Sequence, residues 1–163
     1  MLRGVPLGAF KRGFNLLDES DLLDQSAVPL AVFRGSVWRP SGQIVAGLQT
    51  YEFHPIGRRR FGLDRPAGTV ATARKPSMWS AWWEVEVGSL QYELVPTGRV
   101  ARDWQLHERG EKVGWVAPYR GSTRQVIADL PAELSPSVMA FVVAIVLTMW
   151  RRTPAGGGGD GAV

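Results

Sequence analysis

The sequence contains no cysteine, which excludes a disulfide framework and thiolate chemistry. No apolar run of useful length opens the chain at Met1–Phe10, so we expect no secretory signal there. A strong charge bias is also lacking, since 19 Lys and Arg residues against 15 Asp and Glu residues give a net charge of +4. This modest excess favours anionic partners, either phosphate head groups or nucleic acid, although an Arg-rich, Ala- and Gly-rich composition is more simply explained by a GC-rich genome.

The body of the chain consists of short β-type runs separated by Gly and Pro. With 163 residues and 45% hydrophobic residues, the chain fits one globular domain with one core. Strands at this spacing predict a β-sandwich or β-barrel. The predicted strands are Leu30–Trp38, Ile44–Phe53, Arg59–Leu63, Thr69–Arg74, Ala81–Val87, Leu90–Val95, Asp103–His107, Val113–Pro118 and Arg124–Asp129.

The clearest strand is Ala81–Val87, because every second residue is Trp82, Glu84 or Glu86 and the residues between them are apolar. Successive side chains of a strand point to opposite faces, which places Trp83 inside the domain and Trp82 outside. Glu84 and Glu86 share the outer face, where a solvated surface explains them better than a pair of catalytic carboxylates.

A weak internal repeat predicts a recurring hairpin of strand, polar turn and strand. In each copy a glycine ends the turn and supplies the positive φ that a tight hairpin needs. Unrelated hairpins would give the same pattern, so both interpretations stay open. The three copies are Val37–Ala46 with Gly42, Gly62–Ala71 with Gly68, and Gln105–Gly114 with Gly110.

The last apolar run predicts a helix at Pro136–Trp150. Ser135 is a favourable N-cap and Pro136 a favourable first residue. The apolar part from Val138 is about 20 Å long at 1.5 Å per residue, whereas a bilayer core needs about 30 Å, so a buried core helix is favoured. The alternative is a tail anchor that spans a membrane at residues 134–150, with Arg151 and Arg152 as its flank.

The order of these features resembles the tubby C-terminal-like superfamily, which includes phospholipid scramblases and LURP-one-related proteins. The resemblance covers roughly Phe14 to Arg152 and depends on Phe61–Gly68, Trp83–Val87 and Asp129–Trp150. It implies a mainly β fold, a closed antiparallel β-barrel of about twelve strands wrapped around one C-terminal hydrophobic helix. Such a barrel removes exposed strand edges, and its apolar interior suits a helix that is apolar on every side.

These observations predict one folded domain with two loosely ordered ends. We expect a loosely ordered N-terminus at residues 1–13, the barrel domain at 14–152, and a disordered Gly-rich tail at 153–163.

The resemblance also implies a role that involves lipids. A cysteine for palmitoylation and an acidic Ca²⁺ cluster after the helix are absent from the sequence, so lipid scrambling is not expected. We expect a non-enzymatic binding module for anionic lipid head groups at a membrane surface, in the cytoplasm or peripheral to a membrane. No cofactor and no nucleic-acid partner are expected, and protein partners are left open.

The candidate site is the densest group of cations in the chain. Arginine side chains form paired hydrogen bonds with phosphate oxygens, and lysine adds a point charge. If Arg59–Leu63 pairs with Thr69–Arg74, the cations lie toward the same end of one hairpin; the alternative is a solvated barrel rim. The candidate residues are Arg58, Arg59, Arg60, Arg74 and Lys75.

Three other sites were weighed and are not favoured, so no catalytic residue and no metal ligand is expected. A hydrolase triad can be drawn from Ser80, His107 and Asp103, but no nucleophile elbow surrounds the serine. The two histidines lack the spacing of a zinc site. A base-stacking platform needs several aromatic rings on one surface, and the candidates for it are Trp79, Trp82 and Trp83.

Overall fold

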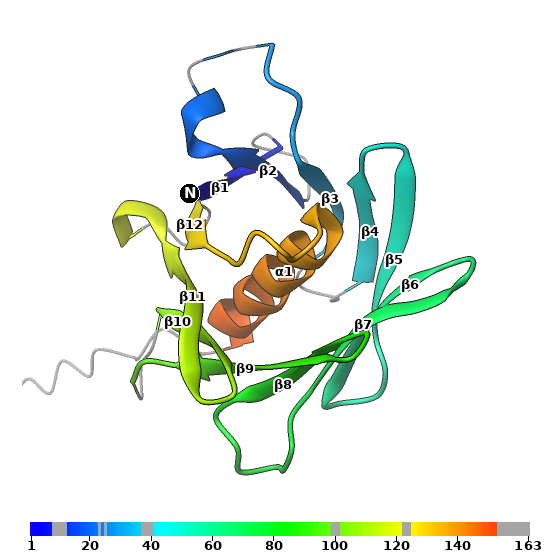
Figure 1. Cartoon of the computed structure of the whole chain (residues 1–163), viewed down its shortest axis with the longest axis vertical. Coiled ribbons are helices and arrows are strands. Elements are labelled where there is room, and N and C mark those ends of the chain that lie inside the picture. The colour runs from blue at the N-terminus through cyan, green and yellow to red at the C-terminus, as the bar shows by residue number, and fades with distance from the viewer. Residues whose placement is uncertain are drawn as a thin grey trace, which may run out of the picture.

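In the computed structural model of the chain, twelve antiparallel strands form a closed barrel around one helix (Figure 1). The structure describes residues 1–7, 13–22, 24, 26–36, 41–98, 102–121 and 125–152; the tail at 153–163, expected to be disordered, lies outside them. Each strand pairs with its neighbours in sequence, and β1 pairs with β12 to close the ring. The strands are β1 (Leu2–Pro6), β2 (Gly13–Asp18), β3 (Ala31–Ser36), β4 (Ser41–Ala46), β5 (Gln49–Pro55), β6 (Arg60–Arg65), β7 (Gly68–Arg74), β8 (Trp83–Val87), β9 (Leu90–Pro96), β10 (Trp104–Glu108), β11 (Glu111–Pro118) and β12 (Val126–Asp129).

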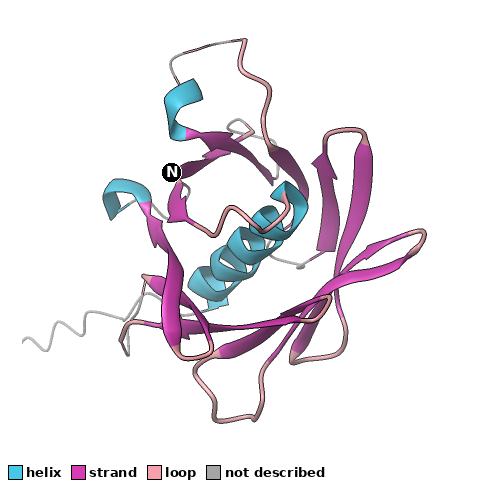
Figure 2. Ribbon diagram, in the orientation of Figure 1, coloured by secondary structure: helices cyan, strands magenta, loops and turns pink. Residues whose placement is uncertain are grey.

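Helix α1 (Pro136–Arg152) lies inside the ring of strands and begins at the predicted residue (Figure 2). All twelve residues from Ser137 to Thr148 are buried, so every face of the helix packs against the barrel. The hydroxyl of Thr148 donates to the carbonyl of Ala144 at 2.8 Å, which satisfies the one polar group of the last buried turn. The expectation of a buried core helix is confirmed. Among the described residues, no helix combines the length and apolar character needed to cross a membrane.

Aromatic rings on the inner wall form a continuous row that reaches the helix. Phe53 stacks on Phe61 at 5.5 Å between ring centroids and contacts Phe141 of α1 edge-on at 5.7 Å. Phe61 in turn stacks on Trp83 at 5.3 Å. Each such pair stabilises a fold by about 0.5–1.5 kcal/mol beyond its buried area. The row therefore fixes α1 to the wall made by β5, β6 and β8.

The alternation of strand directions gives the barrel two distinct ends. At one end lie the connections that follow β1, β3, β5, β7, β9 and β11, together with the C-terminus of α1; we call it the basic end. At the opposite end lie the connections that follow β2, β4, β6, β8, β10 and β12, together with the N-terminus of α1. Two short 3₁₀ helices accompany them: η1 (Glu19–Asp21) at the opposite end and η2 (Tyr119–Gly121) at the basic end.

The strands differ from the sequence-based predictions in three places. The expectation of a loosely ordered segment at 1–13 fails for Leu2–Pro6, which forms β1 and pairs with β12. The single strand predicted at Ile44–Phe53 is a hairpin, because Gly47 adopts a φ of 59° and turns the chain between β4 and β5. That backbone conformation favours glycine. β2 was also missing from the predicted strands.

The predicted hairpin repeat holds in two of its three copies. Gly68 and Gly110 have positive φ and end the turns between β6 and β7 and between β10 and β11. Gly42 does not end a turn, since it lies within β4 and pairs with Gly35 of β3. The first copy therefore differs from the other two in where its glycine falls.

Candidate functional site

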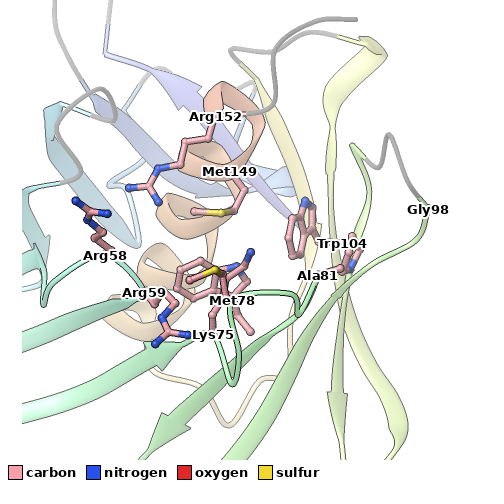
Figure 3. A pocket seen from close by; sticks show the side chains of 11 residues that line it. Arg58, Arg59, Lys75, Met78, Ala81, Gly98, Trp104, Met149 and Arg152 are labelled. Atoms are coloured by element: carbon pink, nitrogen blue, oxygen red, sulfur yellow. The ribbon is translucent and has the colours of Figure 1, made fainter.

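A pocket of about 540 Å³ opens at the basic end of the barrel, beside the last turn of α1 (Figure 3). In this view Arg152 and Met149 lie above Met78 and Lys75, while Arg58 and Trp104 lie on opposite sides. The lining residues come from five separate parts of the chain. They are Arg58, Arg59, Lys75, Met78, Ala81, Trp83, Pro96, Gly98, Trp104, Met149 and Arg152.

The backbone of two neighbouring connections positions three of the pocket's cations. Arg58 and Arg59 lie between β5 and β6, and Lys75 directly follows β7. The amide of Lys75 donates to the carbonyl of Arg59 at 2.9 Å, which extends the pairing of β6 and β7 beyond their ends. The two connections are therefore held together by main-chain geometry that side-chain substitution leaves in place.

The fourth cation of the pocket is Arg152, the last residue of α1, which is the only α-helix in the described residues. Its guanidinium carbon lies 5.6 Å from the centre of the Phe61 ring, a cation–π distance. Because α1 ends here, its terminal carbonyls contribute about half a negative charge to the pocket. That is small beside four full positive charges.

These four cations have no carboxylate partners in the described part of the chain. No acidic residue lines the pocket, and none of Arg58, Arg59, Lys75 and Arg152 forms an ion pair there. Arg74 differs, because its guanidinium lies 2.5 Å from a Glu84 carboxylate oxygen and 4.0 Å from one of Glu86. Like charges gathered in this way repel one another, and an anion in the pocket would relieve that repulsion.

Opposite the cations, the pocket has an apolar wall that contains two hydrogen-bond donors. Trp83 and Trp104 are 1% and 6% exposed, and the indole Nε1 of each finds no acceptor among the described residues. A buried donor without an acceptor costs about 1–3 kcal/mol.

Three of the five predicted site residues line this pocket and two do not. Arg58, Arg59 and Lys75 line it, whereas Arg60 and Arg74 do not. The reason is strand alternation: Phe61 points into the core, so Arg60 and its cross-strand partner Arg74 point outward. Arg60 and Arg74 therefore lie on the outer wall, outside this pocket.

Sequence reasoning missed the residues that distant elements bring to the pocket. Arg152 was interpreted as the flank of a membrane anchor, and Trp104 carried no signal of its own. Trp83 was predicted to lie inside the barrel, and it does, but its place at a pocket was not foreseen.

The hydrolase triad is not assembled in the described residues. The hydroxyl of Ser80 bonds that of Ser77 at 2.8 Å, and Nε2 of His107 lies 3.1 Å from the side-chain oxygen of Gln105. His107 belongs to strand β10 and not to the turn after it. No interaction joins it to Ser80 or to Asp103 in this part of the chain.

The remaining candidates also lie apart from one another. His54 pairs with Asp64 at 3.3 Å, and no group of three or more potential metal ligands occurs among the described residues. The three tryptophans proposed as a stacking platform do not share a surface, because Trp83 is buried and Trp79 is 90% exposed. Glu84 and Glu86 both face Arg74 on the outer wall.

Tyr92 is a buried residue of strand β9 whose pKa is clearly shifted. Burial raises the pKa of its phenol, and the nearby charges of Glu108 and Glu133 raise it further. Both glutamates belong to the opposite end, so this shift lies outside the pocket.

No model of a protein family, no curated protein and no solved structure matches this chain. Membership of the tubby C-terminal-like superfamily therefore stays a prediction. The class of architecture is established by the fold itself: a mainly β protein whose closed twelve-stranded barrel surrounds one helix, with a cationic pocket at one end.

Proposed function

We propose that this protein is a non-enzymatic binding module for anionic lipid head groups, and that the pocket at the basic end is its binding site. One observation carries the proposal: Arg58, Arg59, Lys75 and Arg152 converge on one pocket that no carboxylate of the described residues lines. The lipid-related roles implied by the tubby-like resemblance agree with it. On this proposal the protein is peripheral to a membrane.

The mixed lining of the pocket favours an amphiphile over a simple ion. Besides its cations, the pocket is lined by apolar side chains, among them Trp83, Trp104 and Met149. A phosphate would accept hydrogen bonds from the guanidinium groups of the pocket. The apolar wall would contact the carbon atoms next to that phosphate, and these atoms are absent from inorganic phosphate.

The proposal is tested by neutralising one pocket cation and comparing the result with neutralisation of the next residue in the sequence. At about 0.1 M salt, Arg59→Gln should weaken binding to phosphatidylcholine vesicles that contain phosphatidylserine by about fivefold, the contribution of one cation near an anionic surface. Arg60→Gln removes the same charge one residue away, outside the pocket, and should have less than half that effect. Co-sedimentation measures both; equal losses would show a diffuse effect of net charge and contradict a defined site.

Two soluble compounds separate a lipid head group from free phosphate. Dihexanoyl phosphatidic acid carries both the phosphate and short acyl chains, so it should bind the purified chain more tightly than inorganic phosphate does. Equal affinities would assign the pocket to phosphate alone and contradict the lipid proposal.

A further inference from the structure

Three exposed apolar side chains lie in two neighbouring connections at the basic end. Ile56 precedes the two pocket arginines, and it is 41% exposed. Met78 and Trp79, at 69% and 90% exposed, lie between β7 and β8, directly after Lys75 and Pro76. The amide of Lys75 joins the two connections through its bond to Arg59. Apolar and cationic residues therefore lie together in these two connections.

Local hydrogen bonds hold the exposed pair at the tip of a turn. Ser77 and Ser80 flank Met78 and Trp79, and their hydroxyls lie 2.8 Å apart. The amide of Ser80 also donates to the hydroxyl of Ser77 at 3.1 Å. These bonds order the turn and leave Met78 and Trp79 exposed. A binding partner therefore has little loop entropy to remove.

The described connections at the two ends of the barrel carry opposite charges. The basic end has seven cations and one carboxylate, and the opposite end has four carboxylates and one cationic side chain. An anionic surface would attract the first end and repel the second. The basic end carries Arg58, Arg59, Lys75, Arg102, Arg120, Arg151 and Arg152 with Asp103; the opposite end carries Glu19, Asp21, Asp24 and Glu133 with Arg109.

We propose that the barrel docks end-on to an anionic lipid bilayer, with its basic end toward the membrane and with Trp79 and Met78 inserted among the head groups. The inference rests on the proposed function, since docking brings the pocket to the lipid layer. Tryptophan favours the membrane–water interface, and cations beside it gain from the negative surface potential. Insertion would also cover the exposed apolar residues of this rim.

A bilayer fits this end better than single-stranded nucleic acid does. Nucleic-acid grooves present several aromatic rings to successive bases, whereas Trp79 is the only large aromatic side chain that is strongly exposed in the described residues. Its exposed neighbours, Met78 and Ile56, suit hydrocarbon and offer no ring for stacking.

Removing the tryptophan tests the docking surface while leaving the pocket intact. Trp79→Ala should weaken binding of the full chain to phosphatidylcholine–phosphatidylserine vesicles about tenfold, because the side chain loses its place in the interface. Binding of dihexanoyl phosphatidic acid, a soluble probe of the pocket, should stay unchanged. Leu48→Ala removes a fully exposed apolar side chain from the opposite end and should change neither measurement.

The two probes separate a failure of docking from a failure of the pocket. If Trp79→Ala binds vesicles as the wild type does, the docking proposal is wrong, whatever the soluble probe does. If the wild type binds vesicles through Trp79 but does not bind the soluble probe, docking stands and the proposed pocket function fails. If Trp79→Ala weakens the binding of single-stranded RNA and leaves vesicle binding unchanged, docking to a membrane is overturned.

Discussion

The double variant Arg59→Glu/Lys75→Glu should lose all measurable binding to anionic vesicles. Each reversal removes a positive charge and adds a negative one, so the pocket changes by four charge units. At about 1 kcal/mol per unit near an anionic surface, affinity should fall by about three orders of magnitude. Both residues line the pocket, and the hydrogen bond between them joins main-chain atoms, so the barrel should remain folded. Co-sedimentation at low salt, with circular dichroism to check the fold, measures the effect.

The matched control makes the same change of charge on strand β6, outside the pocket. Arg60→Glu/Arg65→Glu places its substitutions at the two ends of β6, and neither residue lines the pocket. This control should retain most of the binding. Unchanged co-sedimentation of Arg59→Glu/Lys75→Glu would refute the pocket, and an equal loss in the control would reduce the effect to net charge.

Truncating a single side chain of the central helix should bring the barrel close to unfolding. Phe141 is fully buried and contacts Phe53 edge-on at an angle of 72°. Phe141→Ala leaves a cavity that the closed wall cannot fill, so we expect a loss of about 3–5 kcal/mol in the free energy of unfolding. Domains of this size are stabilised by only about 5–15 kcal/mol. Urea denaturation followed by circular dichroism measures the loss.

A surface substitution of similar kind provides the comparison for Phe141→Ala. Leu48 is fully exposed in the turn between β4 and β5, so Leu48→Ala should change the stability by no more than about 0.5 kcal/mol. A loss below about 1 kcal/mol for Phe141→Ala would mean that the helix does not pack tightly inside the barrel.

Features of the fold that depend on local sequence could be predicted, and those that depend on distant pairing could not. The helix at Pro136 is marked by its cap and by its apolar residues, and the face of Trp83 is marked by alternation. β1 has no such signal, because Gly4 and Pro6 weaken its strand character and its partner β12 lies at the far end of the barrel sequence. β1 is ordered by its pairing with β12, which closes the ring of strands.

The same distinction applies to the candidate site. Arg58, Arg59 and Lys75 belong to neighbouring connections of adjacent hairpin strands, so their proximity follows from local pairing. Arg152 reaches them only because α1 runs the length of the barrel interior. Trp104 lies near them only because the closed wall brings β10 to the same pocket. A stricter use of alternation at Phe61 would have placed Arg60 outside the site from the sequence alone.

The most direct test of the pocket follows the indole N–H signals of the tryptophans in a proton–nitrogen correlation spectrum during titration with dihexanoyl phosphatidic acid. If the pocket binds the head group, the signals of Trp83 and Trp104 shift and saturate, because both side chains line the pocket and their surroundings change. The signal of Trp115, on strand β11 away from the pocket, stays in place, and Arg59→Glu/Lys75→Glu abolishes the shifts. Binding of the probe with the Trp83 and Trp104 signals unmoved would contradict the assignment of this pocket as the site.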